Sequence, residues 1–259
     1  MSASRLIAVD IGNSSTKLGW FDSSTEEADT SLPVLAATRS FATGQSPPND
    51  LLSALPSERS AWHVASVHRQ GSRLLTQWIE IHRPGDEVRH LTHRDLPLTV
   101  RVEFPDRVGL DRLAAAVAAN VIRTAARPAI VVDAGSAITV DLVAADGAFE
   151  GGVILPGFQM SAQALYGADM LPLTKFVASD APPPVVGKNT EAAIKSGLFW
   201  GSVGAVREIV ERMTTQLDQP PEIFVTGGDL RQLAVHLGDE ASFVPNLVLC
   251  GVAVAAAAR

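Results

Sequence analysis

Two short stretches of the sequence place an aspartate at the end of an apolar run and a glycine two residues later. The first is "DIGNSSTK" at 10–17, and the second is "DAGSAIT" at 133–139. Glycine permits a tight backbone path, and successive N–H groups and hydroxyls in such a turn can donate hydrogen bonds to phosphate oxygens. A carboxylate at the strand end can hold Mg²⁺ beside those oxygens. Each stretch therefore predicts either a phosphate cradle or a hairpin whose polar residues only satisfy the turn.

A third glycine-bearing stretch is "TGGD" at 226–229, which ends another apolar run. Its glycines would let a flat ligand such as adenine approach the backbone, and Asp229 would cap a following helix. A simple turn between a strand and a helix explains the same residues equally well. The first stretch is not a Walker A loop, because the G-x-x-x-x-G-K-[ST] spacing is absent.

The elements that must position these turns are short apolar strands and amphipathic or Ala-rich helices. Strands are expected at 6–12, 17–22, 33–42, 61–67, 98–104, 128–136, 137–147, 149–157 and 222–228. Helices are expected near 51–55, at 73–82, 109–126, 158–166 and 190–217, from 229, and at 246–258.

One part of this pattern occurs twice. "VDIGNSSTKLGWFD" at 9–22 is echoed by "VDAGSAITVDLVAADG" at 132–147, each being a strand, an Asp-x-Gly turn and a second strand. A supersecondary unit used twice predicts an internally duplicated α/β fold with a ligand cleft between the halves.

The composition limits the class of protein. The chain has 259 residues, 46% of them apolar, and a formal net charge of −7, which disfavours a nucleic-acid or anionic-membrane partner. Its single cysteine, Cys250, excludes a disulfide within the chain and a cysteine-rich zinc site, and is expected to be buried. No apolar run reaches the ~20 residues of a membrane helix, so a cytoplasmic location is expected. The histidines at 68, 82, 90 and 93 fit no zinc spacing.

Six motifs in order along the chain resemble those of the type III pantothenate kinases, in the acetate and sugar kinase and actin superfamily. They are "DIGNSSTK" (10–17), "GLDR" (109–112), "DAGSAITVD" (133–141), "GGVILPG" (151–157), "GKNTEAAIKSG" (187–197) and "TGGD" (226–229). The resemblance implies an α/β fold of two duplicated ribonuclease-H-like (actin-like ATPase) halves, 1–118 and 119–259, with the nucleotide in an inter-domain cleft. It also implies ATP-dependent phosphorylation of pantothenate to 4'-phosphopantothenate, the first step of coenzyme A biosynthesis.

The resemblance further implies a role for each matching residue. ATP phosphates would be held by Asp10, Ile11, Gly12, Asn13, Ser14, Ser15, Thr16, Lys17 and Ser136. Pantothenate would contact Gly109, Leu110, Asp111, Arg112 and Thr190. Asp111 would be the catalytic acid–base residue, Asp10 would bind Mg²⁺, and Asp133 would bind a monovalent cation, K⁺ or NH₄⁺. A homodimer is also implied.

Elementary chemistry fits the assignment of Asp111. Phosphoryl transfer needs positioning and charge stabilisation, with a group placed to accept the hydroxyl proton. At the start of a helix the dipole favours an ionised aspartate, which then acts as a late proton acceptor. Without the resemblance, "DR" at 111–112 also fits an exposed helical turn that carries an ion pair.

The chain departs from the family pattern at three places. Ser136 and Ser14 stand where threonine is common, which keeps the hydroxyl and removes a methyl group. Upstream of "GLDR" the family often has a tyrosine, whereas this chain offers Val102 or Phe104. Two alternative functions stay open: a nucleotide-binding accessory or regulatory relative without catalysis, and another kinase or an exopolyphosphatase-like phosphohydrolase of the same superfamily.

Overall fold

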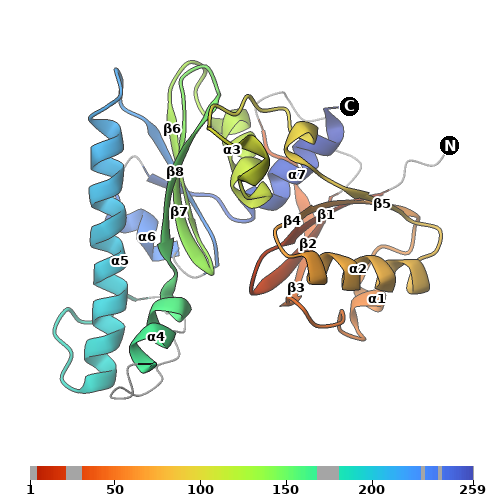
Figure 1. The fold of residues 1–259 in the computed structure, drawn as a ribbon, viewed down its shortest axis with the longest axis horizontal. Helices are drawn as coiled ribbons and strands as arrows, with labels where there is room; N and C mark the ends of the chain where they lie inside the picture. Colours follow the sequence, from red (N-terminus) through yellow and green to blue (C-terminus); the bar gives the residue numbers. More distant parts are fainter. Residues whose placement is uncertain (1–4, 22–30, 168–180, 229–230, 239–240, 259) are drawn as a thin grey trace. The chain divides into compact units, whose positions relative to one another are not determined.

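The structure is a computed structural model that describes residues 5–21, 31–167, 181–228, 231–238 and 241–258. The chain divides into two compact units (Figure 1). The first unit contains the residues up to Ile122 and those from Leu247 onward, and the second contains Arg123–Asn246. Each unit is built on one five-stranded sheet.

The sheet of the first unit has the strand order β3-β2-β1-β4-β5. Its strands are β1 (Arg5–Ile11), β2 (Ser15–Phe21), β3 (Leu35–Ala42), β4 (Ser60–Ser66) and β5 (Glu87–His90). Strand β2 is antiparallel to β1 and β3, whereas β4 is parallel to both β1 and β5. The helical elements are α1 (Leu51–Ala54), α2 (Arg69–His82), α3 (Leu110–Ile122), α7 (Leu247–Ala257), and the 3₁₀ turns η1 (His93–Asp95) and η2 (Pro105–Arg107).

The second unit repeats this topology, with the order β10-β9-β6-β7-β8. Its strands are β6 (Ala129–Ala134), β7 (Ala137–Val143), β8 (Phe149–Pro156), β9 (Glu222–Thr226) and β10 (Ala241–Phe243), and its helices are α4 (Phe158–Tyr166), α5 (Thr190–Thr214) and α6 (Arg231–His236). The strand directions also match, because β7 is antiparallel to β6 and β8 while β9 is parallel to β6 and β10. The predicted duplication is confirmed.

The two sheets also share an irregularity. The pairing of β2 with β3 shifts register between Trp20 and Phe21, and the pairing of β7 with β8 shifts between Leu142 and Val143. Both shifts lie at the end of the second strand of the unit. The irregularity therefore belongs to the repeated unit itself. Bulges of this kind bend a strand and increase its local twist.

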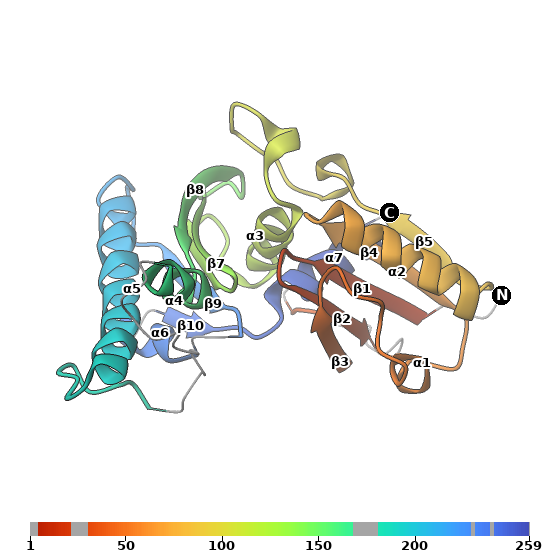
Figure 2. The same ribbon diagram turned by 60° about the horizontal axis from the view of Figure 1, so that its bottom comes forward.

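The first sheet buries its two faces against different helices (Figure 2). On one face Ile7, Val9 and Ile11 of β1 form a core with residues of α1 and α2. Successive residues alternate between faces, so Ala8 and Asp10 belong to the other face. There Gly19, opposite Ala8, leaves room for Leu249 of α7. Small residues on this face therefore let the Ala-rich helix α7 pack close to the strands.

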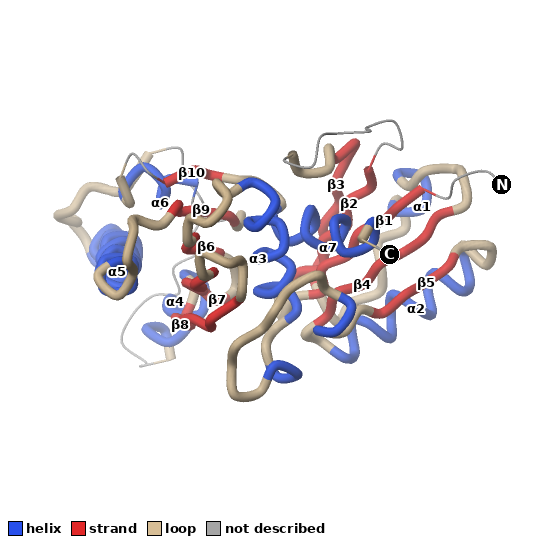
Figure 3. The backbone as a smooth tube through the Cα atoms, turned by 90° about the horizontal axis from the view of Figure 1, so that it is seen from above, coloured by secondary structure: helices blue, strands red, loops and turns tan. Residues whose placement is uncertain are grey.

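The second sheet buries one face against the long helix α5. Ile130 and Val132 of β6 share a core with Phe199, Val203 and Val206 of α5. Figure 3 shows α4, α5 and α6 on the same side of the strands of this sheet. Helix α5 is capped by Asn189, whose side chain accepts a hydrogen bond from the Ala192 N–H at 2.8 Å. The cap fixes where the helix begins and so where Thr190 lies.

A buried ionic cluster holds β4 and the end of α2 together. Asp86 accepts hydrogen bonds from the Arg83 guanidinium at 2.9 Å, the Trp62 indole at 2.8 Å and the Ser60 backbone N–H at 3.0 Å. Burial alone would raise the pKa of the Asp86 carboxyl, but these donors outweigh it and hold that pKa below its usual value. The carboxylate is thus ionised, and its oxygens are hydrogen-bonded within the fold.

Several sequence expectations need correction. The strand expected at 98–104 does not form; η2 begins at Pro105 and the preceding segment is irregular, while the edge of the sheet is the strand β5 at Glu87–His90. Strand β10 was not expected. A division after Ala118 would cut α3, whereas the compact units divide after Ile122 and α7 packs on α3 and β1 in the first unit.

Other expectations agree with the structure. Cys250 is buried, and burial raises the pKa of its thiol to about 11, so the thiol is an unreactive core group. A tight turn follows β7 at residues 146–147, with Gly147 at φ +89°. In the part of the chain that the structure describes, no helix is both long and apolar enough to cross a bilayer. The expected helix cap Asp229 lies outside the described residues.

Candidate functional site

The first candidate cradle is the turn between β1 and β2. The Gly12 N–H donates to the Ser15 carbonyl at 3.1 Å, and the Thr43 N–H donates to the Ser14 carbonyl at 3.0 Å. Asn13 and Ser14 are exposed at the tip. The turn is therefore fixed by its own backbone and by β3, while its polar side chains remain open to a ligand.

Asp10 lies beside this turn as the second-last residue of β1 and is partly buried. Lys17 is directly opposite it on β2, so the two side chains share one face of the sheet. That face is the one that α7 covers. An anion held by the turn would meet a cation at Lys17, and a cation bound to that anion would meet the carboxylate of Asp10.

Ile11 and Thr16 differ from the other residues expected to hold ATP. Their side chains point to the opposite face and are buried, with exposed fractions of 0% and 1%. The hydroxyl of Thr16 is hydrogen-bonded to the Thr43 hydroxyl at 2.9 Å. Their side chains therefore pack in the core beneath the sheet, on the face away from Asp10 and Lys17. Only their backbone groups lie at the cradle.

The second candidate cradle, at the end of β6, is built from tightly packed glycines. The Gly135 N–H donates to the Ala137 carbonyl at 3.0 Å, and the Gly157 N–H donates to the Ser136 carbonyl at 3.2 Å. A side chain at Gly157 would collide with the backbone of Gly135 and Ser136. Gly227, at φ +106°, leaves no room for a Cβ against the Ala134 backbone. Three segments thus converge around Ser136.

Asp133 is the second-last residue of β6 and is partly buried beside this turn. Its neighbours across the sheet are Thr139 on β7 and Thr226 on β9. The turn therefore combines a carboxylate with hydroxyl and carbonyl oxygens, which is the donor set that hard cations such as K⁺ or Mg²⁺ prefer. In the described residues no three His, Cys, Asp or Glu side chains gather as a metal site.

The "GLDR" motif forms the start of helix α3, as expected. Asp111 lies in the first turn, and its Oδ1 accepts a hydrogen bond from the Arg112 N–H at 2.9 Å. A side chain at Gly109 would collide with the Asp111 carboxylate and would begin 3.6 Å from the Val67 Cγ1 atom. A larger residue at position 109 would therefore force the Asp111 carboxylate to move from its observed position.

Val67 joins this motif to the first cradle. Its N–H donates to the Ile11 carbonyl at 3.0 Å, and its side chain lies against Gly109. The carboxyl ends of β1 and β4, the Asp10–Lys17 turn and the start of α3 therefore meet at one edge of the first sheet. The structure brings two of the expected motifs together within one unit.

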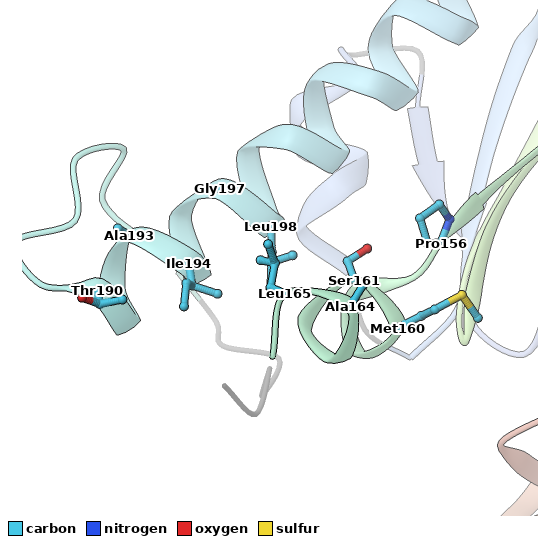
Figure 4. A pocket seen from close by; sticks show the side chains of 10 residues that line it. All are labelled: Pro156, Met160, Ser161, Ala164, Leu165, Thr190, Ala193, Ile194, Gly197 and Leu198. Atoms are coloured by element: carbon cyan, nitrogen blue, oxygen red, sulfur yellow. The ribbon is translucent and has the colours of Figure 1, made fainter. Parts of the chain in front are cut away.

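Thr190 belongs to the second unit, as the first residue of α5. It lines a pocket of about 700 Å³ between α4 and α5, whose other walls include Met160, Leu165 and Ile194 (Figure 4). The lining is mostly apolar side chains. The threonine hydroxyl is one of few polar groups there, and it is exposed.

Comparison with known proteins decides the family. A sequence profile of type III pantothenate kinases matches residues 6–212, which contain every motif described above except "TGGD". The chain belongs to the type III pantothenate kinase family. The match includes residues of both units.

Individual type III pantothenate kinases are similar over shorter stretches. The Rhodopirellula baltica enzyme is 42% identical over 191 residues, which are 71% of this chain and 68% of that protein. The Maricaulis maris enzyme is 42% identical over 134 residues, or 51% of this chain and 50% of that protein. The match thus spans about half the length of the first curated relatives.

Solved structures show the same fold at low sequence identity. A Campylobacter jejuni protein, named as a candidate transcriptional activator of the Baf family, superposes with a TM-score of 0.59 at 20% identity, over 97% of this chain and 98% of that one. A glucokinase from an Antarctic psychrotroph gives 0.52 at 11% identity over the full length of both chains. The chain has the actin-like fold of the sugar kinases.

The sequence of this type III pantothenate kinase family member did not indicate which residues hold the motifs in place. Val67, Thr43 and Gly157 contact the two cradles, yet none was expected to do so. Gly157 had a usable signal, since it ends the motif "GGVILPG". Val67 had none, because a valine after a strand is typical of any core.

Proposed function

We propose that the chain catalyses ATP-dependent phosphorylation of the primary hydroxyl of pantothenate, which gives 4'-phosphopantothenate and ADP, the first step of coenzyme A biosynthesis. The observation that carries the proposal is the contact of Val67 with both Ile11 and Gly109. Through it, the turn proposed to hold the phosphates and the residue proposed to take the proton share one edge of a sheet. Family membership supports the choice of acceptor.

The proposed reaction is a direct transfer. The hydroxyl oxygen of pantothenate forms a bond to the γ-phosphorus of ATP, and the bond between that phosphorus and the bridging oxygen breaks, so ADP leaves with the electron pair. The hydroxyl proton passes to Asp111. Asp111 is proposed to act as a late proton acceptor, after most of the bond to phosphorus has formed. Arg112 is proposed to hold the acceptor through its paired donors.

The phosphates of ATP are assigned to the turn from Asp10 to Lys17 and to Ser136. Exposed hydroxyl and amide groups at Asn13 and Ser14 and the ammonium of Lys17 are suitable donors. Asp10, a partly buried carboxylate beside this turn, fits a Mg²⁺ ion. When bound, Mg²⁺ neutralises part of the phosphate charge.

A monovalent cation, K⁺ or NH₄⁺, is assigned to Asp133. The carboxylate lies at the end of β6, and the carbonyl oxygens of Gly135 and Ser136 in the adjoining turn are proposed to complete a set of oxygen ligands. Ser136 itself is proposed to contact ATP. The hydroxyl at this position is kept although threonine is common in the family.

The active form is proposed to be a cytoplasmic homodimer. The second unit exposes several large apolar side chains near the pocket that Thr190 lines, with exposed fractions of 62% for Ile154, 51% for Met160 and 52% for Tyr166. Large apolar side chains exposed to this extent are proposed to lie in a surface that another copy of the chain covers. Thr190 is proposed to contact pantothenate.

The test is release of ADP measured by a coupled assay with pantothenate, Mg²⁺ and K⁺. Turnover that requires pantothenate supports the proposal. ADP release that is indifferent to pantothenate would instead indicate a phosphohydrolase or another kinase, and ATP binding with no turnover would indicate an accessory relative. Light scattering of the same preparations gives the oligomeric state.

A further inference from the structure

The first unit contains a second feature next to the "GLDR" turn, a pocket of about 680 Å³. Three segments form its walls: Ser66–Val67 after β4, Thr92–Arg94 at η1, and Asp106–Leu110 before and at the start of α3. A volume of this size suits one small-molecule ligand. The pocket lies entirely in one unit, and one of its walls ends at the residue before Asp111.

The walls of this pocket are rich in cationic groups. Arg94 and Arg107 come from two different walls, His93 adds an imidazole, and Asp106 is the one carboxylate in the lining. Within the described residues neither Arg94 nor Arg107 forms an ion pair, whereas Arg89 nearby is paired with Asp95 at 3.4 Å. Two guanidinium groups from residues of the pocket walls are thus available to a ligand.

One of these arginines is already held in position. The guanidinium carbon of Arg107 lies 4.5 Å from the centroid of the Phe104 ring, over its face. Such a cation–π contact restrains the side chain while its N–H groups stay available at the edge of the guanidinium plane. A planar, restrained guanidinium is suited to a carboxylate, which it can bind through two parallel hydrogen bonds.

The pocket adjoins the proposed proton acceptor, because Gly109 and Leu110 line it and Asp111 is the next residue. Arg107 lies on the same wall, two residues before Gly109, and Arg94 lies on the wall at η1. A molecule that presents its hydroxyl to Asp111 and extends into the pocket would therefore place its other end between these walls, where both arginines lie. Two cations there favour an acidic group at that end and disfavour an uncharged one.

From this arrangement we infer that Arg94 and Arg107 recognise the carboxylate of the acceptor and select an acid over its uncharged analogue. The inference rests on the proposed function, because it takes the hydroxyl-bearing end of the acceptor to lie at Asp111. Both arginines lie outside the motifs that the family resemblance assigned. Their role is in binding and specificity, and they take no part in the transfer itself.

The experiment compares two acceptors: pantothenate, and the alcohol in which –CH₂OH replaces its carboxylate. The variants are Arg94→Gln, Arg107→Gln and the control Arg73→Gln, an exposed arginine of α2 that lines a different pocket of the same unit. Each pocket variant is expected to raise KM for pantothenate by about tenfold to a hundredfold, with kcat unchanged, because a hydrogen bond to a charged group is lost.

The alcohol provides the readout that a merely structural role would not produce. Its KM is expected to be the same for the wild type and the two pocket variants, and higher than that of pantothenate for the wild type. The control Arg73→Gln is expected to match the wild type with both acceptors. Pocket variants that raise KM equally for acid and alcohol would overturn the inference, and so would variants with an unchanged KM for pantothenate.

Failure of the proposed function is distinguished by measuring equilibrium binding of pantothenate by calorimetry, with the full chain and ATP present. If pantothenate-dependent ADP release is found but the arginine variants bind normally, the inference alone is overturned. If there is no turnover but binding is lost in Arg94→Gln and Arg107→Gln, the inference stands and the activity is reassigned. A wild-type chain that binds no pantothenate overturns both.

Discussion

Asp10 and Asp133 occupy the same place in two copies of one sheet, each as the second-last residue of the central strand. Their surroundings differ. Opposite Asp10 is Lys17, seven residues later, whereas opposite Asp133 is Thr139, six residues later, because the second turn is one residue shorter. A cation across the strand disfavours a bound metal at Asp10 unless phosphate is also present, while Asp133 has no such neighbour among its sheet partners.

This difference predicts separate effects of cations. The Asp133→Ala variant is expected to lose stimulation by K⁺, with turnover at saturating K⁺ falling to the level of the wild type without K⁺. The measurement is the coupled assay over a K⁺ titration at fixed Mg²⁺. Asp218→Ala, which removes an exposed carboxylate of the same unit, is the control and should keep the full response. An Asp133→Ala enzyme that K⁺ still stimulates would refute the cation assignment.

The Asp111→Asn variant tests the proton acceptor. Its kcat is expected to fall by about 10²-fold or more while ATP binding is retained, since asparagine keeps an oxygen for the Arg112 N–H but cannot take the proton. Steady-state kinetics and ATP binding by calorimetry measure the two effects. Asp50→Asn, at an exposed aspartate before α1 that makes no side-chain cap, should leave both unchanged. Undiminished kcat in Asp111→Asn would move the role to another residue.

A third prediction concerns the glycine pair after β9. Gly227→Ala is expected to lower the free energy of unfolding by about 1–3 kcal/mol, because the residue has φ +106° and its Cβ would meet the Ala134 backbone. Gly228→Ala is the matched control, since no atom lies within 4 Å of the added Cβ. Urea unfolding of the two variants measures the difference. Equal free energies of unfolding for the two variants would contradict the prediction, because they would show that the backbone at residue 227 shifts to accept a Cβ at little cost.

A fourth prediction follows from His63, whose Nδ1 atom is buried with no hydrogen-bond partner. Burial, followed by the charge of Arg89 on the neighbouring strand, lowers the pKa of His63 below 6.5, although Asp95 partly opposes this. The folded state therefore binds this proton less readily than the unfolded state. Stability is expected to fall as the pH drops below about 6.5.

The measurement is the free energy of unfolding in urea between pH 8 and pH 5. Asp86 and Asp95 do not explain a loss in this window, because hydrogen bonds hold the pKa of each carboxyl below 3.8 and their contribution is lost only at lower pH. In His63→Gln the loss of stability should be smaller than in the wild type. His82→Gln, which removes a ring stacked on Trp78, is the control. An identical pH profile for His63→Gln and the wild type would contradict the assignment.

Much of the fold follows from patterns that local physics enforces. The apolar runs that end at Asp10 and Asp133 form strands, and their Asp-x-Gly turns form hairpins, because each pattern satisfies a strand and a turn by itself. The alternating segment 98–104 misled the prediction, since Pro105 and the sheet edge at β5 decide its conformation. Strand β10 is three residues long and too short for any pattern to predict.

The glycines and acidic residues of the candidate site could be predicted from the sequence. The residues that pack against them and hold them in place could not. The spacing in "DIGNSSTK" indicates a turn, but only the register shows that the Thr16 side chain faces the core while Lys17 shares a face with Asp10. The contact of Val67 with Gly109 depends on long-range packing, which no local pattern encodes. The expected nucleotide cleft between the halves stays a prediction.

Helix α7 has a consequence for how the chain folds as it is synthesised. It packs on α3 and β1, and its Gly251 lies against the backbone of Ala114, so the first unit needs a segment that the ribosome makes after the whole second unit. The second unit is contiguous and has all its strands by Phe243. It is therefore the half that can be finished first, while the sheet containing Asp10 waits with an uncovered apolar face for α7. Chaperone dependence is expected to fall on the first unit.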